Sequence, residues 1–88
     1  MAQNPKKQPK ISAKERFASA CATVIRMHRA EMGWSQSDLA VQADLSRAGV
    51  SLIERGIQSP TLWAMKRIAL AFGMSLAHFV TEIEEREA

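Results

Sequence analysis

The sequence predicts an all-α domain of five helices, and three observations lead to this fold class. Apolar residues recur at intervals of three and four along most of the chain, as on the buried face of a helix. Serine residues that can cap a helix precede these segments, and glycine follows three of them. No stretch alternates apolar and polar residues as a half-buried strand does. The 88 residues suffice for one domain with a modest core.

The composition indicates a globular protein. Hydrophobic residues make up 47% of the chain and charged residues 24%, which is typical of a globular domain. No apolar run is long enough to cross a membrane and no segment resembles a cleavable signal, so we expect a cytoplasmic protein without membrane contact. The single cysteine, Cys21, cannot form an internal disulfide bond, which fits a reducing compartment.

Charge and periodicity divide the chain into three parts. Residues 1–11 contain three lysines and no periodicity, so we expect a disordered basic arm that either contacts phosphates or only aids solubility. Residues 12–81 should form the folded domain. Residues 82–88 hold four of the nine acidic residues and are expected to be an acidic tail. The remainder of the chain is strongly basic, which fits a polyanionic partner or ordinary solubility equally well.

The first helix is expected over residues 12–32. Ser12 and Glu15 have the spacing of a capping box, in which each side chain accepts a hydrogen bond from the backbone N–H of the other residue. Cys21 and His28 share the apolar face of this helix. We expect Cys21 to be a small buried side chain, and His28 to be a core or boundary residue rather than a ligand.

The stretch 36–56 predicts two short helices joined by a tight corner. Ser35 opens the first of them, and Asp38 completes a second capping box. Ser46 caps the second helix, and Gly56 ends it. Several positions of the second helix are not needed for the core and form an outward face: Arg47, Ala48, Gly49, Ser51, Leu52 and Arg55.

Ser59 followed by Pro60 predicts the start of a fourth helix, because proline fits the first helical position. Its core positions are expected to be Leu62, Met65, Ile68, Ala69 and Phe72. Lys66 and Arg67 should face away from the core. Trp63 lies off the apolar stripe and should be partly exposed, where it packs on a loop, meets a partner or lies beside a phosphate.

Ser75 is expected to cap a fifth helix with apolar residues at i, i+3, i+4 and i+7. Val80 and Ile83 have no further sequence to cover them. We therefore predict that Phe79, Val80 and Ile83 form a dimer interface.

An ordered set of residues between Ile25 and Phe79 resembles the helix-turn-helix family of phage lambda repressor and its Cro-like relatives. The matching residues are Ile25, Arg26, Arg29, Gly33, Trp34, Ser35, Gln36, Leu39, Ala40, Ala43, Leu45, Ser46, Val50, Ser51, Ile53, Glu54, Arg55, Gly56, Pro60, Leu62, Ile68, Ala69, Phe72 and Phe79. The layout is similar, more weakly, to the small controller proteins of restriction–modification systems. The resemblance implies a five-helix, lambda repressor-like domain that binds duplex DNA as a two-fold dimer, with the helix from Ser46 to Arg55 in the major groove.

The resemblance also assigns roles to individual residues. Arg47, Ala48 and Leu52 would read base edges: Arg47 can pair with guanine, whereas the other two touch only apolar groups such as a thymine methyl. Backbone contacts fall to Gln36, Ser46, Ser51 and Arg55, with the amide of Gln36 expected to face outward. Arg29 and Glu54 correspond to a structural ion pair between the first and third helices.

The chain departs from the family pattern at the corner and on the reading face. Asp44 replaces the usual glycine, and aspartate tolerates the left-handed conformation that the turn requires. Gly49 and Leu52 leave the outward face poor in hydrogen-bonding groups. Either specificity depends on few contacts and on DNA shape, or this face meets a protein.

The sequence therefore predicts a sequence-specific regulator of transcription that binds double-stranded DNA at an inverted repeat as a homodimer. The alternative is an antitoxin or another protein-binding module with the same fold, which the exposed Leu52 and Trp63 and the acidic tail favour. An enzyme is not expected, because His28 and His78 are far apart in sequence and no carboxylate cluster or metal-ligand spacing occurs. We expect no cofactor, no metal and no domain for a small-molecule effector.

Overall fold

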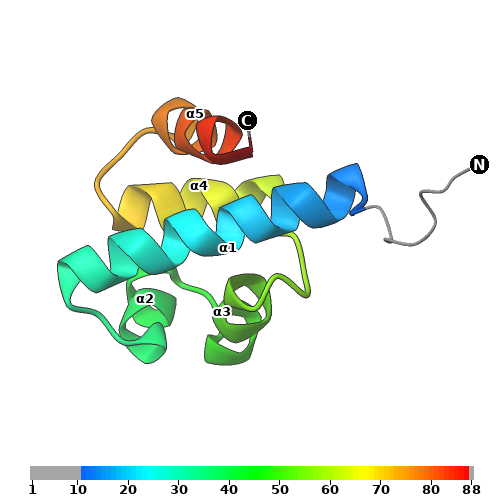
Figure 1. The fold of residues 1–88 in the computed structure, drawn as a ribbon. Coiled ribbons are helices and arrows are strands. Elements are labelled where there is room, and N and C mark those ends of the chain that lie inside the picture. The colour runs from blue at the N-terminus through cyan, green and yellow to red at the C-terminus, as the bar shows by residue number, and fades with distance from the viewer. Residues whose placement is uncertain (1–10, 88) are drawn as a thin grey trace, which may run out of the picture.

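A computed structural model describes residues 11–87, which form five helices and no strand, so the predicted all-α class is confirmed. The helices are α1 (Ala13–Met32), α2 (Gln36–Ala43), α3 (Arg47–Glu54), α4 (Leu62–Ala71) and α5 (Leu76–Glu87). The long helix α1 crosses the middle of the molecule, with α5 on one side and α2 and α3 on the other (Figure 1). Helix α1 packs against α3 and α5, while α4 packs against α2 and α5. Among residues 11–87, no helix combines the length and the apolar character needed to span a membrane.

Local hydrogen bonds begin the helices where the serine positions predict. Ser12 Oγ accepts the N–H of Glu15 at 3.0 Å, and the Glu15 carboxylate accepts the N–H of Ser12 at 2.9 Å. Ser35 and Asp38 form the same reciprocal pair before α2. Ser46 Oγ accepts the N–H at position 49, and Ser75 Oγ accepts the N–H at position 78. These caps satisfy donors that the first turn of a helix leaves free.

The predicted start of α4 is wrong by two residues. Thr61 is the N-cap, and its hydroxyl accepts the N–H of Ala64 at 3.0 Å. Pro60 is buried before the cap, so it does not occupy the first helical position. Leu62, expected in the core, is the first helical residue instead and is 71% exposed. The hydroxyl of Thr61 reaches an N–H of the first helical turn. Ser59 lies two residues earlier in the chain and is too far from that turn to cap it.

The corner between α2 and α3 forms without glycine. Asp44 adopts the left-handed conformation with φ of 56°, and its N–H binds carbonyls in the last turn of α2. Arg67 Nε donates to the carbonyl of Ala43 at 3.0 Å, and its guanidinium lies 3.4 Å from the Asp44 carboxylate. Arg67 therefore does not face away from the domain as expected. It connects α4 to the C-terminal end of α2, where a positive charge is favoured.

The C-terminal residues continue a helix that contributes Ile83 to the core, and they do not form a separate tail. Residues 82–87 continue α5, and Phe79 and Ile83 are both 0% exposed. They share one apolar cluster with Cys21, Val24 and Ile25 of α1. The expectation that nothing remains to cover Ile83 is wrong, because α1 lies far away in sequence but beside α5 in the fold. Residues 1–10 of the predicted basic arm (residues 1–11) lie outside the described residues.

Candidate nucleic-acid interface

Helix α3 presents one face to the core and the other to solvent. Val50 and Ile53 belong to the buried core, where α3 packs against α1 and α2. Arg47, Ala48 and Arg55 are exposed, and Ser51 and Leu52 are half-buried. The residues predicted to read bases thus lie on the outward side of α3, as the helical spacing requires.

Two arginines of α1 fix the C-terminal end of α3. Arg29 donates from Nε and Nη2 to the two carboxylate oxygens of Glu54, at 2.8 and 2.9 Å. The hydrogen bonds to Glu54 raise the pKa of the Arg29 guanidinium above its ordinary value. Arg29 also donates to the carbonyl of Trp34, and Arg26 donates to the backbone carbonyl of Glu54 at 2.6 Å. The predicted pair of Arg29 and Glu54 is therefore present, and the structure adds Arg26 to it.

The amide of Gln36 does not face outward as expected. Its Nε2 donates to Oε1 of Glu54 at 3.2 Å, and its side chain is half-buried. This contact brings the first turn of α2 to the end of α3, so Gln36 and Arg55 both border Glu54. A phosphate contact by Gln36 would use the backbone N–H groups at the start of α2, where a helix favours an anion. Sequence reasoning missed the inward amide because a glutamine in a first turn gives no sign of a partner eighteen residues away.

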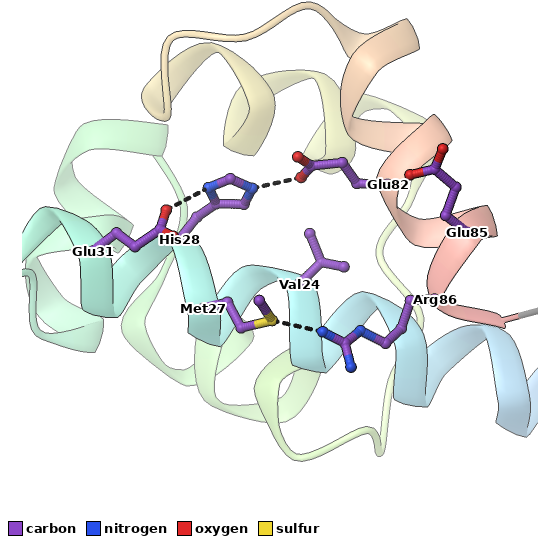
Figure 2. A pocket seen from close by; sticks show the side chains of 7 residues that line it. All are labelled: Val24, Met27, His28, Glu31, Glu82, Glu85 and Arg86. Atoms are coloured by element: carbon purple, nitrogen blue, oxygen red, sulfur yellow. Dashed lines mark hydrogen bonds and ion pairs between the residues drawn. The ribbon is translucent and has the colours of Figure 1, made fainter.

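A second polar cluster lies in a groove of about 450 Å³ between α1 and α5 (Figure 2). His28 Nε2 lies 2.5 Å from Oε1 of Glu82, and His28 Nδ1 lies 3.3 Å from Glu31. His78 lies 3.2 Å from the other oxygen of Glu82. These contacts lower the pKa of Glu82, chiefly through the hydrogen bond with His28. Within residues 11–87, no group of three or more His, Cys, Asp or Glu is arranged to hold a metal ion.

Helix α5, which forms one wall of this groove, lies on the side of α1 opposite to α2 and α3 (Figure 1). His28 is therefore a boundary residue, which joins α5 to α1 through Glu82. Cys21 is fully buried, and burial raises the pKa of its thiol to about 11. Such a thiol is an inert core group at neutral pH.

The segment that contains α2 and α3 matches a known protein family. Residues 25–79 match the helix-turn-helix family HTH_3, which covers more than half of the chain. The chain belongs to this family. An uncharacterized HTH-type transcriptional regulator of Methanothermobacter thermautotrophicus is 41% identical over 51 residues, which are 58% of this chain and 74% of the relative. The transcriptional regulator SutR of Escherichia coli is 31% identical over 67 residues, which are 76% of this chain and only 38% of SutR.

The solved structures include a restriction–modification controller, C.Esp1396I, as a tetramer in complex with its natural 35-base-pair operator. This controller superposes with a TM-score of 0.72 at 28% identity, over 81% of this chain and 93% of its own chain. The resemblance to lambda repressor-like proteins and to controllers is thus confirmed. The HTH_3 family is one of transcriptional regulators rather than of enzymes.

Proposed function

We propose that this helix-turn-helix protein binds double-stranded DNA at an inverted-repeat operator as a homodimer, with α3 in the major groove. The observation that carries the proposal is the rigid attachment of α3: Glu54 is 3% exposed and is held by Arg29, Arg26 and Gln36. A helix fixed in this way presents Arg47 and its neighbours in one orientation, which is what groove insertion needs. The operator complex of the similarly folded controller supports the proposal.

Within this proposal the outward residues divide into two groups. Arg47 at the exposed start of α3 pairs with guanine, and Ala48 and Leu52 lie beside it on apolar groups. The second group contacts phosphates and sets the position of the domain without reading sequence: Gln36, Ser46, Ser51 and Arg55.

Footprinting on DNA that includes the protein's own promoter tests the sequence specificity. The proposal expects two protected half-sites with their centres about one helical turn apart, because a two-fold dimer presents two copies of α3. Uniform protection that disappears as salt increases would show charge-driven, non-specific binding instead.

Binding to an inverted repeat requires two copies of the chain. The fold limits which residues can form the contact between the two copies. Phe79 and Ile83 are committed to the monomer core, so Val80 alone of the three predicted interface residues keeps accessible surface. Helix α4 exposes Leu62, Trp63 and Leu70. Exposed apolar surface of this kind marks protein contacts. We assign the subunit contact to this surface of α4 together with Val80.

Analytical ultracentrifugation of a Trp63→Glu variant tests the subunit contact. Trp63 is 66% exposed in the monomer, and Arg67 lies 5.6 Å from its ring, so the substitution does not open the core. The wild type should sediment as a dimer and the variant as a monomer. A dimeric variant would place the contact elsewhere.

The alternative function is a protein-binding module such as an antitoxin, and the exposure of Leu62 and Trp63 is the observation that favours it. Purification from the native host separates the two functions. A second protein in stoichiometric amount, bound over Arg47 so that DNA cannot enter, would support the alternative. Purification of the chain alone, in a form that binds operator DNA, would support the regulator.

A further inference from the structure

The middle of the outward face of α3 lacks hydrogen-bonding side chains apart from one serine. Between Arg47 and Arg55, the residues with accessible surface are Ala48, Gly49, Ser51 and Leu52. Of these, Ser51 alone carries a polar side chain. Direct recognition of bases by hydrogen bonds is therefore concentrated at Arg47, at one end of the face.

Two polar side chains next to α3 are already engaged inside the domain. The Gln36 amide, at the start of α2, already donates to Glu54. The Asp44 carboxylate, at the corner, lies beside Arg67. Both side chains have partners inside the domain, so Ala48 and Leu52, with Ser51, set the character of the α3 surface between Arg47 and Arg55.

Ala48 and Leu52 are one helical turn apart and lie on the same stripe of α3. Four residues correspond to about 6 Å along the helix axis. Successive base pairs are about 3.4 Å apart, so the two side chains can reach neighbouring or next-neighbouring base pairs.

The major groove offers an apolar side chain only one favourable contact. Guanine, adenine and unmodified cytosine expose donors and acceptors there, whereas thymine adds the methyl group on C5. A leucine placed against a polar base edge would remove water from that edge without replacing its hydrogen bond, which is unfavourable. Contact with a C5 methyl removes apolar surface from water on both sides.

We propose that this chain reads the C5 methyl groups of pyrimidines at the positions that face Ala48 and Leu52, next to the guanine read by Arg47. This inference rests on the proposed function of α3. Because neither side chain bonds to the O4 or N4 atom of the base, the protein recognises the methyl group and not the identity of the pyrimidine. At these positions 5-methylcytosine therefore takes the place of thymine, and C5 methylation of a cytosine there increases the occupancy of the operator.

The test uses the full chain and an operator found by selection from random DNA. At each pyrimidine of a half-site, duplexes are made with thymine, uracil, cytosine or 5-methylcytosine, each paired with its complement, and the Kd is measured at one salt concentration. At the methyl-contacting positions we expect thymine and 5-methylcytosine to bind alike. Uracil and cytosine should bind about fourfold more weakly per position, which corresponds to ~0.8 kcal/mol for one methyl-sized group.

Two variants of Leu52 connect the effect to this side chain. Leu52→Gln keeps the length of the side chain but replaces its apolar end. The difference in Kd between thymine and uracil should therefore disappear at the position that faces Leu52 and remain at the other positions. Leu52→Met keeps the apolar end and should retain the difference, which also shows that substitution at this half-buried site is tolerated. Circular dichroism confirms that both variants fold.

The outcomes separate the inference from the proposed function. A selected operator that binds equally well with uracil and thymine at every position overturns methyl reading and leaves the regulator intact. Methyl reading is also overturned if 5-methylcytosine binds as weakly as cytosine. That result would show that the protein recognises the O4 atom of thymine. If selection yields no specific operator, the proposed function itself fails.

Discussion

Glu54 is almost fully buried at the end of α3, where side chains from two other helices bind it. Arg29 and Gln36 bind its carboxylate, and Arg26 binds its backbone carbonyl. A buried carboxylate is tolerated only when it is paired and hydrogen-bonded, and removal of one partner leaves a charge that the core cannot solvate. The sequence alone did not reveal this cluster: the Arg29–Glu54 pair was expected only from the family resemblance. Gln36 and Arg26 were not expected to join it.

Replacement of Arg29 by Met tests the importance of the pair for stability. The variant should lose about 3–5 kcal/mol of unfolding free energy in urea titrations, because Glu54 remains buried and unpaired. Arg26→Met is the matched control, and it should cost about 1 kcal/mol because it removes one bond from an exposed side chain to a backbone carbonyl. Equal losses in the two variants would contradict the central position of the ion pair.

At the scale of helices, local features were predictable and distant ones were not. The serine caps of α1, α2, α3 and α5 form within three residues, so the sequence indicates them. The start of α4 was misplaced because Ser59–Pro60 and Thr61 are adjacent start signals. The burial of Ile83 was missed because its cover comes from α1, more than fifty residues earlier.

The attachment of α5 should weaken in acid. The pKa of Glu82 is lowered in the folded state, mainly by the hydrogen bond with His28 and also by the charges of His28 and His78. A carboxyl with a lowered folded pKa stabilises the fold above its unfolded pKa, and this contribution is lost as pH falls through the folded value. The contribution should be below about 1 kcal/mol, because the group is partly exposed to solvent.

Urea titrations near neutral pH and below the ordinary carboxyl pKa measure this loss. Wild type should lose more stability on acidification than Glu82→Gln, which has no carboxylate to protonate. Glu84→Gln, an exposed position on the same helix, is the control and should behave like wild type. Some acid sensitivity should persist in every variant, since the Ser12 hydrogen bonds also lower the pKa of Glu15. An identical acid response in wild type and Glu82→Gln would exclude Glu82 as a source of the effect.

Across the whole molecule, one group of acidic side chains lies apart from the exposed arginines of α3. Glu31, Glu82 and Glu85 line the groove between α1 and α5 (Figure 2), and α5 lies across α1 from α2 and α3 (Figure 1). Arg47 and Arg55 are exposed on α3. With a net charge of +3 and these three carboxylates placed away from the exposed arginines of α3, the chain can approach a polyanion with α3 forward.

Salt dependence distinguishes phosphate contacts from base contacts on this surface. Arg55→Gln should weaken binding to all DNA sequences alike and should reduce the slope of log K against log salt by about 1 for each half-site. The preference for the operator over unrelated DNA should remain. A variant that lost the preference but kept the slope would show that Arg55 reads bases.

Operator affinity after charge reversal on opposite sides of the molecule tests the central claim most directly. The Kd for the selected operator is compared at one salt concentration for wild type, Arg47→Glu and Arg86→Glu, where Arg86 lies on α5 beside Met27. We predict at least about a tenfold loss for Arg47→Glu, because a bidentate arginine–guanine pair is worth 1–3 kcal/mol, and almost no change for Arg86→Glu. Equal effects of the two reversals, or full affinity in Arg47→Glu, would contradict the placement of α3 in the DNA groove.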